Sequence, residues 1–289
     1  MPIREFARAK VNLTLRVLGR RPDGYHELES LVTFAELHDV VALQPGTSGS
    51  VAVTGPFAQY IGGENLLVRA LNVLRDVAPG LALGAVRLEK NLPVAAGIGG
   101  GSADAAALLR AVRRANPEHT GAVDWMGIAE KLGADVPVCL LDAPALMTGK
   151  GERIAPVARL PGAAAVLVNP GVPLATAQVF EKLAAGVLSA GDRTQPQALR
   201  IADLDGLVGY MRGAGNDLED PARRLLPEIG AVKAALGAEP GCLFAAMSGS
   251  GPTCFGVFSD QHAAKRAAQA IAASHPNWWV ADTALAGSG

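Results

Sequence analysis

The segment Gly97–Ser102, which reads G-I-G-G-G-S, constrains the fold of this chain more than any other stretch. It follows an alternating segment, residues 86–89, whose period of two predicts a strand. The residues after it carry helical spacing from about residue 102 to residue 115. Glycines let backbone amides approach a ligand closely, and a helix start adds unpaired N–H groups with a partial positive charge. This strand–loop–helix pattern predicts a phosphate-binding site rather than a flexible turn.

Two common phosphate-binding loops do not fit this segment. A P-loop needs Gly-Lys-Ser/Thr at the helix start, and the segment contains no lysine. The dinucleotide pattern G-x-G-x-x-G fails because Ser102 occupies its last position. Ser102 has two interpretations, as a hydroxyl ligand of a phosphate or a magnesium ion, or as the helix N-cap. Asp104, in the first helical turn, is expected to complement the helix dipole rather than to bind metal.

Periodicity and breakers predict an α+β chain of about two domains over its 289 residues. The boundary is expected between residues 152 and 153, where glycines and prolines cluster, giving domains 1–152 and 153–289. Strands are predicted at residues 7–17, 28–34, 40–43, 51–53, 86–89, 164–168, 242–247, 253–258 and 278–281. Helices are predicted at residues 65–77, 102–115, 124–132, 175–185 and 260–273, with two or three short helices before residue 236 and a polar linker near residues 191–197.

Composition excludes several classes of protein. A hydrophobic content of 49% excludes a disordered chain, and a net charge of -1 argues against a general nucleic-acid binder. No apolar run approaches the roughly 18 residues that cross a membrane. The N-terminal sequence MPIREFARAK lacks an apolar signal core, which favours a cytoplasmic location. The three cysteines are widely spaced and are expected to be buried free thiols, and the scattered histidines are not expected to form a metal cage.

Four features outside the first loop are further candidates for chemistry. Lys10 and Asn12 share one face of the first predicted strand, which is either a solvated face or a buried functional pair. Asp135, in L-G-A-D-V-P, enters an apolar stretch and needs a partner, for which Lys10 is a candidate. Tyr25 lies in a polar, glycine-flanked turn, where it either stacks on a base or packs under the turn. The second glycine loop, Ser248–Pro252, is either a hairpin turn or a second wall of the nucleotide site.

Three short motifs lie near the start, the middle and the end of the chain. They are K-V-N-L from Lys10, P-V-A-A-G-I-G-G-G-S-A-D-A-A-A from Pro93, and S-G-S-G-P-T-C-F from Ser248. In this order they resemble the three motifs of the GHMP small-molecule kinases. Four further features resemble the branch that acts on a cytidine diphosphate conjugate of methylerythritol: A-K-V-N-L at residues 9–13, R-P-D-G-Y-H-E-L at 21–28, E-N-L at 64–66 and L-G-A-D-V-P at 132–137.

The resemblance implies a two-domain GHMP kinase fold, with an N-terminal domain like ribosomal S5 domain 2 and a ferredoxin-like C-terminal domain. It implies ATP and Mg²⁺ as cofactors, phosphorylation of the 2-hydroxyl of the conjugate in non-mevalonate isoprenoid synthesis, and Asp135 as the base with Lys10 as its partner. The nucleotide-binding positions it implies are Asn65, Lys90, Pro93, Val94, Ala95, Ala96, Gly97, Ile98, Gly99, Gly100, Gly101, Ser102, Ala103 and Asp104. The substrate-binding positions are Asn12, Tyr25, His26, Thr176 and Phe180.

The larger relatives of this family hold magnesium with a loop glutamate that has no clear counterpart here, so no metal ligand is assigned. Two alternatives are weighed against this interpretation. A kinase for homoserine or a mevalonate derivative would not need Tyr25 and His26, because those substrates have no base to stack. A catalytically inactive nucleotide-binding protein is expected to lack Lys10 or Asp135, and this chain has both.

Overall fold

A computed structural model of the chain describes residues 1–46, 49–62, 65–188 and 199–288. The chain forms two compact units. Unit 1 comprises Met1–Ala9, Leu37–Val94 and Gly99–Asp142, and unit 2 comprises Lys10–Glu36, Ala95–Ile98 and Ala143–Gly289. The chain does not divide at the predicted boundary between residues 152 and 153. Each unit is built from several segments, because two strands, β1 (Ile3–Asn12) and β3 (His26–Gln44), run through both units.

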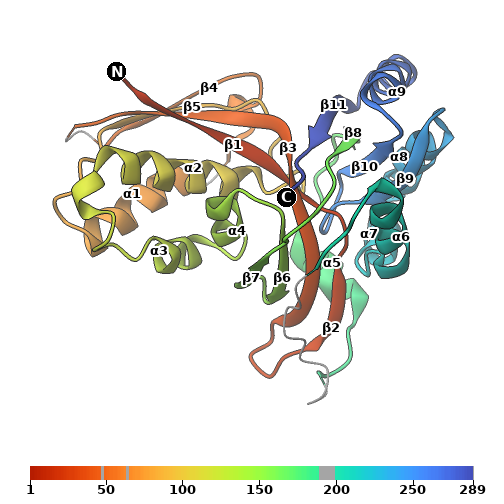
Figure 1. Cartoon of the computed structure of the whole chain (residues 1–289), viewed down its shortest axis with the longest axis horizontal. Coiled ribbons are helices and arrows are strands. Elements are labelled where there is room, and N and C mark those ends of the chain that lie inside the picture. Colours follow the sequence, from red (N-terminus) through yellow and green to blue (C-terminus); the bar gives the residue numbers. More distant parts are fainter. Residues whose placement is uncertain (47–48, 63–64, 189–198, 289) are drawn as a thin grey trace. The chain divides into compact units, whose positions relative to one another are not determined.

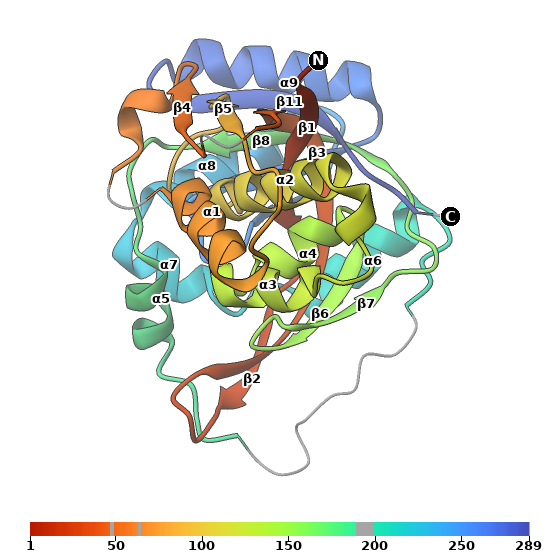
Figure 2. The same cartoon turned by 90° about the vertical axis from the view of Figure 1, so that its left-hand side faces the viewer.

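Unit 1 is a small sheet with helices on one face (Figures 1 and 2). In the sheet, β4 (Val51–Thr54) pairs in parallel with β5 (Ala85–Glu89), which pairs antiparallel with residues 40–44 of β3. The helices are α1 (Leu66–Val77), α2 (Gly100–Ala115), α3 (Trp125–Leu132) and α4 (Val136–Leu141).

Polar side chains cap the starts of two of these helices. The Asn65 side chain accepts a hydrogen bond from the Leu67 N–H and begins α1, whose apolar stripe is buried. The Asp124 side chain accepts from Gly127 N and begins α3, which ends before Gly133. Both predicted helices are confirmed.

Unit 2 contains an antiparallel sheet in the order β3-β11-β8-β10-β9. Its later strands are β8 (Ala163–Asn169), β9 (Cys242–Met247), β10 (Cys254–Phe258) and β11 (Trp279–Leu285). The first half of β3 also pairs with β2 (Arg16–Arg20) and with β6 (Ala145–Gly149), which pairs with β7 (Arg153–Pro156). The helices of unit 2 are α5 (Thr176–Leu183), α6 (Leu204–Ala214), α7 (Glu219–Leu225), α8 (Glu228–Ala238) and α9 (Gln261–Ser274).

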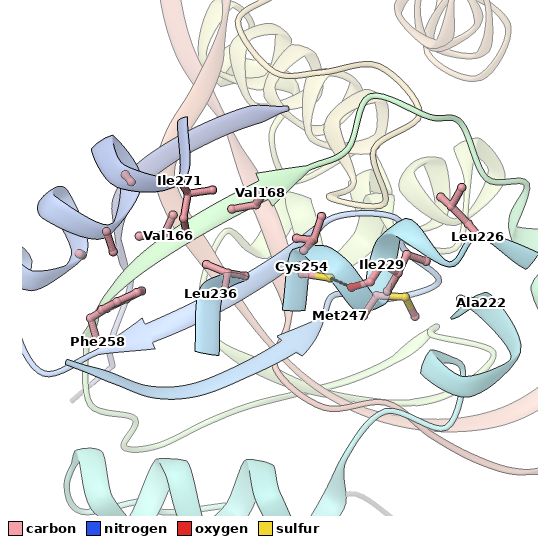
Figure 3. Close-up of a cluster of buried hydrophobic side chains, with 14 of the residues drawn as sticks. Val166, Val168, Ala222, Leu226, Ile229, Leu236, Met247, Cys254, Phe258 and Ile271 are labelled. Carbon is pink, nitrogen blue, oxygen red and sulfur yellow. Dashed lines mark hydrogen bonds between the residues drawn. The ribbon is translucent and has the colours of Figure 1, made fainter. Parts of the chain in front are cut away.

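The core of unit 2 lies between strands β8 to β10 and the helices α7 to α9 (Figure 3). Val166 and Val168 of β8 meet Ile271 of α9 and Leu236 of α8, and all four side chains are buried. Each such side chain stabilises the fold by about 1.5–3 kcal/mol relative to an exposed position. This packing fixes the hairpin of β9 and β10, and with it the loop at the hairpin's tip.

Several strand predictions were wrong in extent. The predicted strand 7–17 is two strands, because the N–H groups of Leu13 and Thr14 both donate to the Leu31 carbonyl and interrupt the ladder. The predicted strands 28–34 and 40–43 are one strand, β3. Helix α4 and the β6–β7 hairpin were not predicted, and the predicted linker near 191–197 lies outside the described residues.

The three cysteines are free thiols, as expected. Cys139 and Cys254 are buried, but Cys242 is only half-buried, so the expected burial is wrong for Cys242. In the part of the chain that the structure describes, no helix is long and apolar enough to cross a membrane.

Candidate active site

The glycine-rich loop joins β5 to α2 and contains three left-handed residues. The φ angles are 54° at Ala95, 74° at Gly97 and 65° at Gly99. Gly99 is the N-cap of α2, so the helix begins at Gly100, two residues earlier than predicted. The interpretation of Ser102 as the N-cap is therefore wrong. Ser102 is half-buried in the first turn of the helix, and its role as a ligand group remains a prediction.

A glycine cap adds no side-chain acceptor to the first turn of α2. The N–H groups of that turn and the partial positive charge of the helix end suit an anion. Gly101 adds a second indication. A Cβ atom there would meet no atom within 4 Å in the described part of the chain, and its φ is not in the left-handed range. Neither packing nor backbone strain demands this glycine, so close approach of a ligand is the better explanation. The loop therefore fits an anionic group such as a phosphate.

Within unit 2, the first half of this loop is bound to the second glycine loop. The Ala96 carbonyl accepts hydrogen bonds from Thr253 N, at 3.3 Å, and from Thr253 Oγ1, at 2.5 Å. A Cβ atom on Gly97 would lie 2.2 Å from the carbonyl oxygen of Gly251. The Ser248–Pro252 loop is thus a hairpin connection between β9 and β10 and also a support for the phosphate loop.

Within unit 1, a buried ion cluster lies under the start of α2. Lys90 Nζ is 2.5 Å from Asp39 Oδ2 and 2.7 Å from Asp104 Oδ2, and all three side chains are buried. A Cβ atom on Gly100 would be 3.2 Å from that Nζ. The Lys90 ammonium group is thus held by two carboxylates. A contact of Lys90 with the adenine or ribose of the nucleotide remains a prediction.

Asp104 lies beyond the first turn of α2, which contains no acidic residue, so its expected role of complementing the helix dipole there is wrong. Burial raises the pKa of its carboxyl group to about 8, against the opposing attraction of Lys90. Its second oxygen, Oδ1, is buried without a hydrogen-bond partner in the described part of the chain. Asp39 was missed by sequence reasoning, although an acid inside the strand-like run H-D-V-V-A-L is itself a signal of a buried partner.

The predicted catalytic residues Lys10 and Asp135 belong to different units. Lys10 is buried in β1 with 4% exposure, and Asn12 of the same strand is also buried. The interpretation of a solvated strand face is therefore wrong. The Lys10 backbone N–H donates to the Ile98 carbonyl of the phosphate loop. Asp135 is half-buried at the N-cap of α4, and its side chain makes no capping hydrogen bond there. Their catalytic partnership remains a prediction.

The predicted substrate-binding residues all lie in unit 2, and several of them meet. The rings of His26 and Phe180 stack with centroids 4.8 Å apart and planes at 23°. Thr176 Oγ1 is 2.8 Å from Ser250 Oγ in the second glycine loop. Burial, reinforced by Arg20, lowers the pKa of His26, so the imidazole is neutral at pH 7.

Two further substrate candidates differ sharply in exposure. The Asn12 amide donates from Nδ2 to Ser30 Oγ, and the Asn12 backbone N–H donates to Ser248 Oγ. Tyr25 is 60% exposed, so it does not pack under the preceding turn as the alternative required. Lys150 Nζ lies 4.7 Å from the centre of its ring. An exposed aromatic ring beside a cation is a suitable platform for a base.

Among the described residues, no three histidine, cysteine or acidic side chains lie together in a way that could hold a metal ion. Magnesium in nucleotide sites keeps several waters and is held by phosphates with one or two protein oxygens. Asp104 is buried against Lys90, so Ser102 is the candidate among the predicted loop residues.

Comparisons with known proteins show which family the chain resembles. The model of the GHMP kinases N-terminal domain matches residues 65–149, and the model of the GHMP kinases C-terminal domain matches residues 197–277. A 4-diphosphocytidyl-2-C-methyl-D-erythritol kinase of Parvibaculum lavamentivorans is 49% identical over 289 residues, covering 99% of each chain. The enzyme of the same name from Methylorubrum extorquens is 49% identical over 284 residues, covering 97% of this chain and 98% of the other.

Solved structures are similar as well. A crystal structure of 4-(cytidine 5'-diphospho)-2C-methyl-D-erythritol kinase has a TM-score of 0.77 at 36% identity, covering 99% of this chain and 100% of the other. The mevalonate kinase of L. major has a TM-score of 0.72 at 18% identity, covering 99% and 97%. At that identity the second likeness concerns the fold alone.

Proposed function

The chain belongs to the GHMP kinase family, and we propose that it transfers the γ-phosphoryl group of ATP to the 2-hydroxyl of 4-diphosphocytidyl-2-C-methyl-D-erythritol. The observation that carries this proposal is identity of 47–49% over nearly the full length to relatives that bear this enzyme's name. The reaction belongs to non-mevalonate isoprenoid precursor synthesis. We further propose that it takes place in the cytoplasm on a free small molecule, without nucleic acid or membrane.

ATP is the phosphoryl donor of this reaction, and the glycine-rich loop is proposed to hold its phosphates. Phosphoryl transfer depends mainly on positioning and on neutralising charge. The N–H groups at the start of α2 supply both without a lysine in the loop. Mg²⁺ would offset charge on the phosphates, with Ser102 as the proposed protein ligand.

Asp135 is proposed as the general base that takes the proton of the substrate hydroxyl. A carboxylate does this once it is ionised and within hydrogen-bond reach of the hydroxyl. Lys10 is proposed to be the partner of that carboxylate and to stabilise charge on the attacking oxygen. Burial of Lys10 supports this role, because a buried ammonium group interacts more strongly with nearby charge than an exposed one.

The substrate's cytosine is proposed to stack on Tyr25, beside the stacked rings of His26 and Phe180. A neutral His26 has one donor and one acceptor nitrogen, which suits the hydrogen-bonding edge of a base. Thr176 and Asn12 are proposed to contact the erythritol end. An exposed aromatic platform has no use in a kinase for homoserine or mevalonate, so it favours the cytidine-bearing substrate over those alternatives.

The test is an ADP-release assay with the cytidine conjugate, homoserine, mevalonate and galactose as acceptors. We expect turnover with the conjugate only. Turnover with homoserine or mevalonate would replace the proposed substrate within the same family. Binding of ATP without turnover on any acceptor would favour an inactive nucleotide-binding protein.

A further inference from the structure

Two buried polar residues, Thr253 and Asn169, form a chain of hydrogen bonds that ends on the phosphate loop. Neither residue is among the predicted ligand-binding positions. We propose that Thr253 and Asn169 are positioning residues that aim the Gly97 amide at the phosphates of ATP. This inference rests on the proposed kinase function. Both residues lie in unit 2, as does the loop segment Ala95–Ile98, so the hydrogen bonds between these residues and the loop lie in one compact unit.

The hydrogen bonds of these two residues form a directed chain. Asn169 Oδ1 accepts from Gly171 N at 2.8 Å, which orients the amide. Asn169 Nδ2 then donates to Thr253 Oγ1 at 2.8 Å. Since that bond occupies an acceptor site of the hydroxyl, its proton is directed to the Ala96 carbonyl, 2.5 Å away. The amide thus determines which way the threonine hydroxyl points.

The Ala96 carbonyl sets the direction of the next N–H group. A peptide unit is planar and trans, so the C=O of Ala96 and the N–H of Gly97 point in opposite directions. Thr253 binds the carbonyl with both its hydroxyl and its backbone N–H. Holding the carbonyl against the second glycine loop therefore turns the Gly97 N–H away from that loop. The Ile98 carbonyl is held in the same way by Lys10 N, at 2.9 Å, which turns the Gly99 N–H.

The backbone beside this clamp needs such support. Ala95 has a φ of 54°, a conformation that costs a residue with a Cβ atom free energy and persists only where its surroundings fix it. Ala95 is also exposed, so its own side chain supplies little packing to hold it. Thr253 and Asn169 have exposures of 0% and 5%, and their hydrogen bonds are shielded from water. They are thus suited to fix the adjacent peptide before ATP arrives, which reduces the ordering cost of binding.

The test compares Thr253→Val with a matched control, Thr33→Val. Thr33 is also buried in unit 2, and its hydroxyl donates to the Ala286 carbonyl at 2.6 Å, away from both glycine loops. Each variant removes one buried hydroxyl donor at nearly constant volume, but Thr253→Val also leaves Asn169 Nδ2 without its acceptor, so it should lower the melting temperature more than Thr33→Val does. We expect Thr253→Val alone to raise the Kd of a non-hydrolysable ATP analogue and the KM for ATP, by about tenfold. Thr33→Val should leave both within about twofold of the wild type.

Two further variants keep the test decisive if Thr253→Val does not fold. Thr253→Ser retains the hydroxyl and should restore ATP affinity to nearly the wild-type value. Asn169→Ala frees the hydroxyl to rotate and should raise the Kd of the analogue by about threefold. Equal Kd values for Thr253→Val and Thr33→Val, or no rescue by serine, would overturn the positioning role. Failure of the proposed function is separate, because it would appear as wild-type enzyme that releases no ADP with the cytidine conjugate.

Discussion

Lys90 Nζ lies 2.7 Å from Asp104 Oδ2, and this contact ties the end of β5 to the first turns of α2 across the phosphate loop that joins them. The lysine is also bonded to Asp39, whose Oδ1 accepts from the backbone N–H groups of Asn91 and Leu92. Two carboxylates and one ammonium group leave a net negative charge unless one acid is protonated. The residues on both sides of the phosphate loop are therefore joined by a cluster whose net charge depends on pH.

Asp104→Asn should change how stability depends on pH. The folded-state pKa of Asp104 is raised to about 8 from 3.8, so its contribution to stability is fully present below pH 3.8 and is lost as pH rises towards 8. The wild type should lose stability with rising pH by up to about 1 kcal/mol per pH unit more than the variant over this window. Urea unfolding at several pH values between 5 and 9 measures the difference. Parallel curves for the two proteins would contradict the protonated state of Asp104.

Gly97→Ala should destabilise the protein and abolish ATP binding. The new Cβ atom would lie 2.2 Å from the Gly251 carbonyl oxygen, and the φ of 74° adds strain. Displacing that backbone is expected to cost more than about 2 kcal/mol. Thermal unfolding and calorimetry with an ATP analogue check both effects. A variant with wild-type melting temperature and affinity would mean that the two loops do not press together at this position.

Gly101→Ala, in the same loop, should raise the melting temperature of the protein and weaken its binding of ATP. Its Cβ atom meets no atom within 4 Å in the described part of the chain, and alanine is the better helix former by about 1 kcal/mol. The melting temperature should therefore rise, while the KM for ATP increases because the methyl group occupies the approach of the phosphates. An unchanged KM for ATP would show that the phosphates do not approach this face of the first turn.

Asp135→Asn should remove most turnover and leave ATP affinity nearly unchanged. Loss of a general base typically lowers the rate by about 10²–10⁴-fold. The amide keeps the shape of the side chain, and the position makes no side-chain capping bond, so α4 should remain intact. Single-turnover rates and analogue Kd values distinguish a chemical defect from a binding defect. A rate within a few-fold of the wild type would remove Asp135 from the catalytic role.

Much of the fold could be predicted where local chemistry decides it. Asn65 and Asp124 begin their helices as capping residues. The composition of the glycine-rich loop predicts an anion site. The long strand β3 could not be predicted as one element, because its two ends pair with different strands. Residues 26–32 pair with β2 and β6, and residues 40–44 pair with β5.

The buried parts of the site were harder to predict, because they depend on contacts between distant segments. Asp39, Lys90 and Asp104 carry separate local patterns, and only folding shows that they share one cluster. Thr253 and Asn169 are 84 positions apart in sequence, and neither residue type at its position signals a contact with the phosphate loop. The motif near the C-terminus indicated the loop but not the threonine that follows it as a support.

The last prediction concerns substrate choice, and Tyr25→Ala tests it against a matched surface tyrosine. Tyr25 and Tyr60 have exposures of 60% and 61%, so their removal should cost similar and small amounts of stability. Stacking of a base on an aromatic ring is worth about 1–3 kcal/mol, so Tyr25→Ala should raise the KM for the cytidine conjugate by roughly tenfold or more. Tyr60→Ala, in unit 1, should leave that KM unchanged, and Tyr25→Phe should retain it because the ring remains. If alanine at position 25 leaves the KM for the conjugate unchanged, the base must be recognised elsewhere in unit 2, and the stacked pair of His26 and Phe180 becomes the next surface to test.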